Sequence, residues 1–262
     1  MKASPQDVMT AKLFMNAAFP VMQVLIDDDP KLNKKFAAFH AVVQFGALDD
    51  NEPLFCHLIF DGGKVTVVQG KAPAADLALT FSGIAKMNAL LKGGMSLPSI
   101  KGKLGLLPNV LSLLLGLKIM TKDNAKLVDP AEKALKVKCS LYMITRALSQ
   151  YNKLGNPEMQ EFCQRQPDRI YQFKVEQDGN PAFIAAYLRV KAGKSKSGHG
   201  VYERRSPFVL FRFTSVDGAL KILDKEVQFV EGVEKGYVET IGSPEYAMYL
   251  NDYMAVLQGM LT

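Results

Sequence analysis

The chain contains Val43-Gln44-Phe45 and, after a short gap, the turn-like stretch Asp50-Asn51-Glu52-Pro53-Leu54-Phe55. At a distance of 128 residues it contains Tyr171-Gln172-Phe173 and then Asp178-Gly179-Asn180-Pro181-Ala182-Phe183. Further matches flank this pair in the same order: Leu13-Phe14-Met15 with Leu141-Tyr142-Met143, Asp29-Pro30 with Asn156-Pro157 across a one-residue gap, and Leu79-Thr80-Phe81 with Phe211-Arg212-Phe213 after a net insertion of four residues. An ordered series of this kind indicates an internal duplication.

The length of the repeat sets the expected domain organisation. A period of 128 residues far exceeds the ~20–50 residues of solenoid repeats, so each copy is a whole domain rather than a stacking unit. The chain has 262 residues, of which 48% are hydrophobic and 22% charged, which is typical of globular proteins. We predict two tandem domains, residues 1–135 and residues 136–262.

Each copy shows the same succession of periodic segments and turn signals. The expected elements of the first copy are a helix over 8–25 with a kink at Pro20, a short helix over 31–40, strands over 41–48, 54–60, 64–69 and 76–81, a helix over 82–91, a strand near 100–106 and an apolar helix over 109–120. Strands in succession with helices at the two ends predict an α+β fold. We expect each domain to have a mostly antiparallel sheet of about five strands covered by helices.

Three stretches of the first copy carry a family resemblance: Asp76-Leu77-Ala78-Leu79-Thr80-Phe81, Leu90-Leu91-Lys92-Gly93-Gly94, and Ile100-Lys101-Gly102-Lys103-Leu104-Gly105-Leu106. With them the sequence resembles the sterol carrier protein two family. Its members typically show an acidic residue opening an alternating strand, a helix ending in leucines and glycine, and a Gly-Lys-Leu strand before a C-terminal apolar helix. The second copy matches loosely, because 208–213, 220–223 and 237–242 lack the acidic opener and the Gly-Lys-Leu signature.

The resemblance implies a small α+β domain that encloses an apolar tunnel between its sheet and its helices. Such a tunnel holds a fatty acyl chain, sterol, phospholipid or acyl-CoA, and no catalysis is implied. Two such copies in one chain can satisfy internally an interface that a single-copy relative would use for dimerisation, so we expect a monomer built as an intramolecular pseudo-dimer.

The candidate lining residues lie on the last strand and the flanking helices of each copy. We expect them to be Phe81, Met87, Leu90, Leu91, Leu104, Leu106, Val110, Leu111 and Leu114 in the first copy, and Phe213, Leu220, Leu223, Tyr246, Tyr249 and Tyr253 in the second. The three tyrosines share one helix face, where they can pack in a core, face the other copy or contact a polar lipid head group.

The segment 104–117 is apolar on nearly all sides after Asn109. We therefore expect it to be buried on every face, as pseudo-dimer core, as tunnel lining, or as both. It is shorter than the ~20 residues of a membrane-spanning helix and contains Pro108, so we interpret it as buried rather than transmembrane.

Cations gather in the second copy, at Lys191, Lys194, Lys196, Arg204 and Arg205. Glycine and serine between them predict a hairpin loop that is either simply solvated or docked to anionic head groups or CoA phosphates. The net charge of the chain is +6, and the loop offers no base-stacking aromatics besides Tyr202, so nucleic acid is not expected as a partner.

The residues that usually carry catalysis are scattered. Cys56 and His57 are neighbours on an expected strand, so their side chains point to opposite faces and cannot pair as nucleophile and base. His40 and His199 have no acidic or thiol grouping at metal-ligand spacing, and no cofactor motif is present. We therefore expect no enzyme activity, no cofactor and no metal.

The sequence thus favours non-catalytic binding or transfer of an apolar lipid or acyl-CoA, with transient contact to an anionic membrane surface. Widely spaced cysteines favour a reducing compartment, and no signal peptide is evident at Met1 to Asp7, so we expect a cytoplasmic location. Two alternatives stay open. One is a ligand-free structural or protein-interaction module in which each copy fills the other's cavity; the other is an accessory domain of a lipid-metabolising enzyme.

Overall fold

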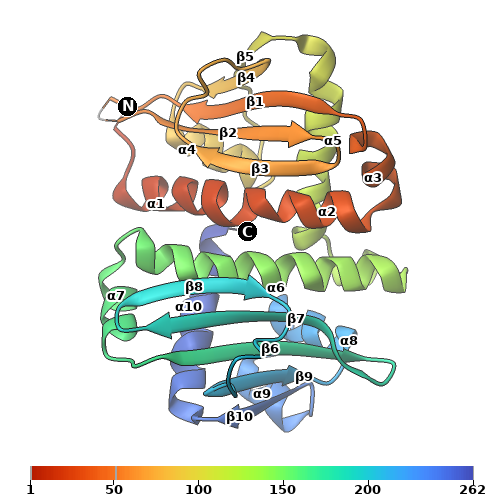
Figure 1. Cartoon of the computed structure of the whole chain (residues 1–262), viewed down its shortest axis with the longest axis vertical. Coiled ribbons are helices and arrows are strands. Elements are labelled where there is room, and N and C mark those ends of the chain that lie inside the picture. Colours follow the sequence, from red (N-terminus) through yellow and green to blue (C-terminus); the bar gives the residue numbers. More distant parts are fainter. Residues whose placement is uncertain (1, 51, 262) are drawn as a thin grey trace. The chain divides into compact units, whose positions relative to one another are not determined.

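The computed structural model of the chain describes residues 2–50 and 52–261 (Figure 1). Asn51, which belongs to the first expected hairpin turn, and Met1 and Thr262 lie outside the described residues. By its internal contacts the chain divides into two units, residues 2–119 with Leu261 (unit 1) and residues 120–260 (unit 2). The boundary expected at 135/136 falls inside a continuous helix, α6 (Pro130–Lys153).

Unit 1 contains a five-stranded sheet in the order β3-β2-β1-β4-β5. Its strands are β1 (His40–Ala47), β2 (Leu54–Asp61), β3 (Lys64–Gln69), β4 (Leu77–Phe81) and β5 (Ser99–Gly102). Neighbouring strands run antiparallel except β1 and β4, which are parallel. The sheet is therefore mixed but mostly antiparallel, and the α+β class is as expected.

The helices of unit 1 precede, interrupt and follow the sheet. They are α1 (Pro5–Leu13), α2 (Met22–Asp28), α3 (Pro30–Phe36), α4 (Ile84–Leu91) and α5 (Leu107–Leu117). Helices α1 and α2 are joined by a π-helical turn over Phe14–Ala18 and a 3-10 turn over Phe19–Val21. Pro20 lies in that junction. A proline lacks the backbone N–H of a regular helix and disturbs the preceding turn, which explains the irregular geometry there. At the residue where a kink was expected, the structure thus shows an interruption of the regular α-helical geometry.

The core of unit 1 lies where helices cover one face of the alternating strands. In β4, Leu77, Leu79 and Phe81 are buried while Ala78 and Thr80 are half-buried, as the period of two requires. Helix α4 packs on β1 and β4, and α2 packs on β3 and α5. Figure 1 shows α4 and α5 on the far side of the sheet from the viewer.

Asp76, the acidic residue before β4, has a structural role. Its carboxylate accepts the backbone N–H of Val42 at 2.9 Å and pairs with Lys103 Nζ at 2.8 Å. The hydrogen bond from Lys103, followed by that from Val42, lowers the pKa of the Asp76 carboxyl. Asp76 therefore fastens the start of β4 to β1 and to the residue after β5.

Unit 2 contains a second five-stranded sheet in the order β10-β9-β6-β7-β8. Its strands are β6 (Arg169–Gln177), β7 (Asn180–Lys191), β8 (Lys194–His199), β9 (Val209–Phe213) and β10 (Val238–Gly242). Besides α6, its helices are α7 (Pro157–Gln164), α8 (Val216–Leu223), α9 (Phe229–Glu234) and α10 (Pro244–Leu261). Helix α9 has no counterpart among the described residues of unit 1.

Residues that the sequence repeat pairs occupy equivalent positions in the two sheets. Phe45 of β1 lies opposite Leu79 of β4 in a parallel pair, and Phe173 of β6 lies opposite Phe211 of β9 in the same way. The residue pairs Asp29-Pro30 and Asn156-Pro157 begin α3 and α7, each with the Asp or Asn side chain accepting backbone N–H groups of the first turn. The two units therefore share strand order, register and helix starts.

One expected strand is shorter than predicted. Strand β5 ends at Gly102, and Leu104–Leu106 forms a 3-10 turn instead of continuing the strand to 106. Gly102 has a φ of +104°, and a Cβ added to it would stand 2.2 Å from the carbonyl oxygen of Asp76. This close approach turns the chain away from the sheet, and α5 follows directly.

Candidate functional site

The candidate residues of unit 1 separate into three groups by burial. Phe81, Met87 and Val110 are buried in the core. Leu90, Leu91, Leu106 and Leu114 are half-buried. Leu104 and Leu111 are exposed, with 62% and 42% of their surface accessible. The first group is therefore enclosed in the core of unit 1, and the other two are progressively open to solvent.

Helix α5 corrects the expectation that segment 104–117 is buried on every face. Only Val110 and Leu113 of the helix are buried, and the apolar stretch Leu104–Thr121 is 17% buried. The buried side packs on α2 and α3, where Leu25 Cδ1 would lie 3.2 Å from a Cβ placed on Gly116. The expectation was wrong because periodicity reports how apolar a helix is, and tertiary packing decides which faces are covered.

A second apolar helical stretch behaves differently. Two stretches are long and apolar enough to cross a membrane by length and composition alone, Leu104–Thr121 and Pro5–Asp28. Pro5–Asp28, which comprises α1, the two turns and α2, is 72% buried. Such burial is what the core helix of a globular domain shows.

The candidate residues of unit 2 are mostly engaged with one another or with neighbouring side chains. Phe213 and Leu220 are buried, while Leu223, Tyr246 and Tyr253 are half-buried. Tyr249 is 48% exposed, and its hydroxyl donates to Glu245 Oε1 at 3.3 Å. The three tyrosines do line one side of α10, as their spacing predicted.

The tyrosine stripe belongs to an aromatic cluster inside unit 2. Tyr246 packs 5.3 Å from Phe208 and 6.1 Å from Phe162, measured between ring centroids, and the Arg169 guanidinium lies 4.5 Å from its ring. Tyr253 packs 5.4 Å from Phe162, and its hydroxyl donates to the carbonyl of Glu158 at 3.2 Å. These contacts hold α10 against α7 and the sheet. They agree with the alternative in which the three tyrosines pack in a core.

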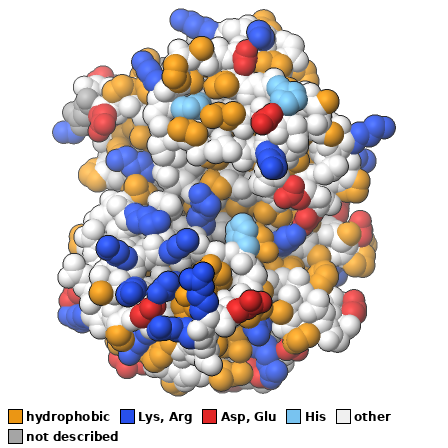
Figure 2. All heavy atoms as spheres, viewed as in Figure 1, with side chains coloured by type: hydrophobic (Ala, Val, Ile, Leu, Met, Phe, Trp, Pro, Cys, Tyr) orange, Lys and Arg blue, Asp and Glu red, His pale blue; other side chains and the backbone are white. Residues whose placement is uncertain are grey.

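The cationic residues of unit 2 occupy a β-hairpin. Lys191 ends β7 and Lys194 begins β8, so the stretch 194–199 that was expected to be a loop is a strand joined by a two-residue turn. Residues Ala192 and Gly193 both have positive φ, as a tight hairpin turn requires. Figure 2 shows Lys and Arg side chains gathered over this part of unit 2.

Part of this positive charge is already neutralised. Asp168 accepts a paired hydrogen bond from Arg189, at 2.8 Å and 2.6 Å, and lies 3.5 Å from Arg205. The hydrogen bond from Arg189 lowers the pKa of the Asp168 carboxyl. Lys191, Lys194, Lys196 and Arg204 are the remaining expected docking residues, and the first three lie on the hairpin itself.

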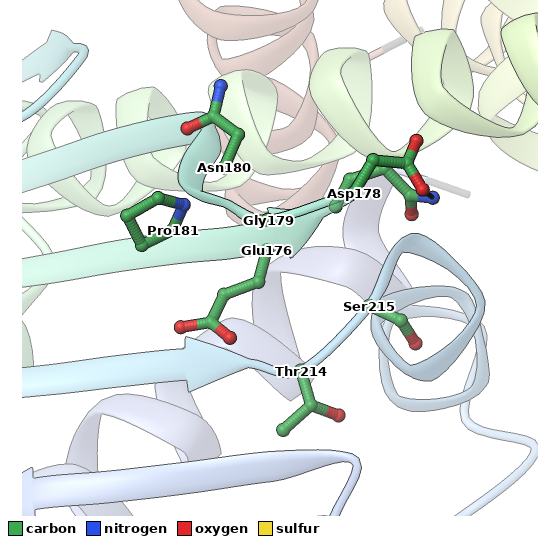
Figure 3. A pocket seen from close by; sticks show the side chains of 8 residues that line it. Glu176, Asp178, Gly179, Asn180, Pro181, Thr214 and Ser215 are labelled. Carbon is green, nitrogen blue, oxygen red and sulfur yellow. Dashed lines mark hydrogen bonds between the residues drawn. The ribbon is translucent and has the colours of Figure 1, made fainter.

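Two hollows in unit 2 contain none of the expected lining residues. One of about 220 Å³ lies at the β6–β7 turn and is lined mainly by polar side chains, with Glu176, Asp178, Asn180, Thr214 and Ser215 around it (Figure 3). The other, of about 330 Å³, lies between the start of α6 and α8 and includes Phe183 and Val216. The first is too polar to hold an apolar chain.

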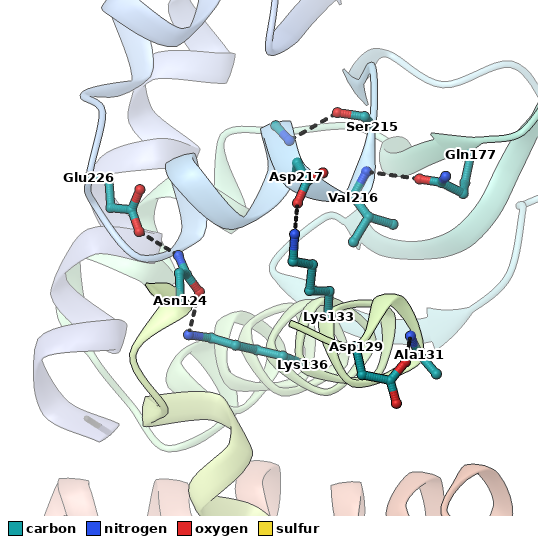
Figure 4. A network of polar contacts seen from close by, with 11 residues as sticks. Asn124, Asp129, Ala131, Lys133, Lys136, Gln177, Ser215, Val216, Asp217 and Glu226 are labelled. Atoms are coloured by element: carbon teal, nitrogen blue, oxygen red, sulfur yellow. Dashed lines mark hydrogen bonds and ion pairs between the residues drawn. The ribbon is translucent and has the colours of Figure 1, made fainter. Parts of the chain in front are cut away.

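Sequence reasoning missed a buried charged network beside the second hollow. Lys136 of α6 is 1% exposed, and its ammonium group donates to the carbonyl of Lys122 at 2.5 Å and to Asn124 Oδ1 at 2.9 Å, and pairs with Asp224. Figure 4 shows Lys136 reaching Asn124, whose amide in turn donates to Glu226. A lysine in an amphipathic helix carries no sequence signal for burial, so the partners could be found only in the structure.

The thiols and imidazoles do not form a reactive group. Burial raises the pKa of Cys56 and of Cys163 to about 12. His57 Nδ1 lies 3.0 Å from the carbonyl of Gly70, and the His199 ring stacks on Tyr142 with 3.8 Å between centroids. Among residues 2–50 and 52–261, no three His, Cys, Asp or Glu side chains are grouped as metal ligands would be.

The chain resembles several solved structures at low sequence identity. The solution structure of palmitated sterol carrier protein 2 like 2 from Aedes aegypti is 17% identical, with a TM-score of 0.31, and the match covers 42% of this chain and 90% of that one. A crystal structure of sterol carrier protein 2 is 15% identical, with a TM-score of 0.31, and the match covers 40% of this chain and 96% of that one.

A third structure covers more of this chain. An inverting sec-alkylsulfatase from Pseudomonas sp. is 10% identical, with a TM-score of 0.25 over 69% of this chain and 30% of that enzyme. No protein-family model and no curated protein matches the chain. These TM-scores are too low to carry a functional argument, so we infer function from this chain's own residues.

Proposed function

We propose that the chain is a tandem pair of sterol-carrier-like domains that binds an apolar lipid without chemical turnover. The observation that carries the proposal is the surplus of apolar surface on α5 and the end of α4. Leu90, Leu91, Leu106 and Leu114 are only half-buried, and apolar surface left open over several neighbouring side chains marks ligand-binding or interaction sites. A fatty acyl chain, sterol, phospholipid or acyl-CoA lying against them would complete the burial that the polypeptide leaves unfinished.

The proposed site is a tunnel between the β4–α4 side of the sheet and α5. Phe81, Met87 and Val110 form its floor, and the half-buried leucines form its walls. Affinity would come from removing apolar surface from water, at roughly 25 cal/mol for each Å². In unit 2 the equivalent positions are Phe213, Leu220, Leu223, Tyr246, Tyr249 and Tyr253, and the cationic hairpin is a candidate contact for acidic head groups or CoA phosphates.

Non-catalytic binding agrees with the environment of the polar groups. The two thiols whose pKa is raised to about 12 are buried. All three cysteines are free, which favours a reducing compartment, and a cytoplasmic location stays a prediction.

The test begins with the purified chain. Its mass under native conditions is compared with its denatured mass, and any released molecule is identified by lipid extraction and mass spectrometry. A bound acyl lipid supports the proposal and identifies the cargo. A native mass equal to the bare chain, together with no uptake of added fatty acid, acyl-CoA or phospholipid, would overturn it.

One variant tests where the lipid binds. Leu111→Asp introduces a charge on a helix side chain that is 42% exposed, so the domain should fold while uptake is abolished. Undiminished binding by a folded Leu111→Asp chain would place the lipid elsewhere.

A second candidate function is protein interaction without a ligand. The exposed side of α5 favours it, because apolar helix faces are also used to bind partner proteins. Capture of lipid by the chain as purified would decide against this reading.

A further inference from the structure

The acidic residues of the chain are unevenly distributed. From Leu77 to Lys122 the sequence contains six lysines and neither aspartate nor glutamate, in a chain whose whole formal net charge is +6. Five of these lysines, at positions 86, 92, 101, 103 and 118, fall in unit 1. Lys103 is paired with Asp76, and the others belong to a stretch that contributes no negative charge of its own.

The same stretch exposes large apolar side chains. Between α4 and β5, Met95 is 100% exposed and Leu97 is 94% exposed. Neither residue is needed by the core of unit 1 in this position. Fully exposed methionine and leucine side chains that follow a Gly93-Gly94 pair project from the domain rather than packing on it.

Helix α5 carries a regular stripe of exposed apolar side chains. Pro108, Leu111 and Leu115 are all exposed, and their spacing of three and four residues places them on one side of the helix. Leu104, in the 3-10 turn before the helix, is exposed as well. The opposite side holds the buried Val110 and Leu113. Helix α5 thus has two apolar sides, and only the side with Val110 and Leu113 is covered by the rest of the unit.

We infer that this surface, which we call the lysine–leucine surface (Met95, Leu97, Lys101, Leu104, Leu111 and Leu115), docks on anionic lipid bilayers. Apolar side chains that enter the head-group region and cations near them, here Lys101 in a stretch of sequence without acidic residues, are the two components of interfacial membrane binding. Each lysine near an anionic surface contributes about a fivefold gain in affinity. Leu104 and Leu111 are also expected cargo-lining residues, so the test of this inference uses Met95, Leu97 and Lys101, which are not among them.

The composition of this surface favours a bilayer over a folded partner. Protein-binding hot spots are enriched in tryptophan, tyrosine and arginine set in recessed, well-packed sites. Residues 92–118 contain none of these three residue types. The same absence of aromatic side chains disfavours base stacking on nucleic acid.

The experiment measures partition of the full chain onto vesicles of phosphatidylcholine with and without phosphatidylserine. We expect binding to the anionic vesicles that weakens as salt is raised, because salt screens the lysines. Met95→Glu with Leu97→Glu should weaken binding at least about tenfold, since both side chains would otherwise enter the interface. Lys101→Gln should weaken it about fivefold.

Matched variants in unit 2 distinguish this surface from others. Val128 is 89% exposed, so Val128→Glu changes an equally open apolar side chain and should leave partition unchanged. Lys126 is exposed, so Lys126→Gln removes a cation from unit 2 as Lys101→Gln removes one from unit 1, and it should leave partition unchanged. Equal partition of the Met95→Glu, Leu97→Glu chain and the parent chain would overturn the inference, as would loss of binding in Lys126→Gln alone.

The outcome is separable from that of the cargo proposal. Fatty-acid uptake measured in solution should be the same for the Met95→Glu, Leu97→Glu chain and the parent. A second outcome would also overturn the inference. If the parent chain forms a dimer that the same two substitutions dissociate, and if it does not bind vesicles, a second copy of the chain covers this surface.

Discussion

Lys136 places an ammonium group almost entirely out of solvent within unit 2. Burial raises the pKa of its partner Asp224, although the hydrogen bond from Lys136 acts in the opposite direction. Replacing Lys136 with methionine would therefore leave a half-buried carboxylate without its counter-charge. We expect Lys136→Met to lower the free energy of unfolding by about 3 kcal/mol, measured by urea denaturation at neutral pH.

The same carboxyl gives this variant a distinctive pH dependence. A group whose pKa is higher in the folded state than in the unfolded state favours folding when protonated, and that contribution is lost as pH rises through the folded-state pKa. Without Lys136 the pKa of Asp224 should rise further, so the deficit of Lys136→Met should shrink as pH falls from neutral. Lys136→Met with Asp224→Asn should be less destabilised at neutral pH than Lys136→Met alone. A deficit independent of pH would show that lost packing, not the carboxylate, is responsible.

The cysteines make a second residue-scale prediction. The thiolate is the reactive form, and burial raises the pKa of Cys56 and Cys163 to about 12. Neither should react with iodoacetamide at pH 8 in the native chain, and both should react in denaturant. Mass spectrometry of the alkylated peptides reads the two sites separately. Rapid native labelling of either residue would mean that its strand or helix opens locally.

At the scale of the element, α5 has a buried and an exposed side that should respond differently to truncation. Leu113 is buried and Leu115 is 59% exposed. Leu113→Ala should lower the free energy of unfolding by about 2–4 kcal/mol, because it leaves a cavity. Leu115→Ala should change it by less than about 0.5 kcal/mol, as surface substitutions do. Urea denaturation of both variants makes the comparison, and equal losses would mean that the exposed stripe is covered in solution.

Local signals located most elements, and tertiary packing determined the rest. The expected strand over 64–69 is β3 to the residue, because the Asp61-Gly62-Gly63 turn fixes its start. Leu104-Gly105-Leu106 alternates as a strand does, yet it is a 3-10 turn because the backbone bends at Gly102 against Asp76. The exposure of Leu104 and Leu111, two expected lining residues, could not be predicted either, since packing on α2 and α3 decides which side of α5 is covered.

At the scale of the whole molecule, the two units share a topology but differ in how their apolar side chains are used. In unit 2 the Phe173 and Phe211 rings stack with 4.7 Å between centroids, and Tyr171 is fully buried with its hydroxyl bonded to Gln166. The α10 tyrosines join the same aromatic packing. In unit 1 the equivalent helix, α5, leaves all of its leucines except Leu113 half-buried or exposed. If unit 1 binds lipid as proposed, aromatic side chains in unit 2 take the part that the lipid plays in unit 1.

This asymmetry predicts one lipid molecule per chain, held by unit 1. Titration with a fluorescent fatty acid should saturate at one equivalent, and native mass spectrometry should show a single adduct. Leu111 and Tyr249 are matched for the comparison, because they are 42% and 48% exposed and lie on equivalent helices. Leu111→Asp should abolish the adduct, whereas Tyr249→Asp should preserve it. Two equivalents, or loss of binding in Tyr249→Asp, would show that the aromatic core of unit 2 opens to admit a ligand and that both units carry lipid.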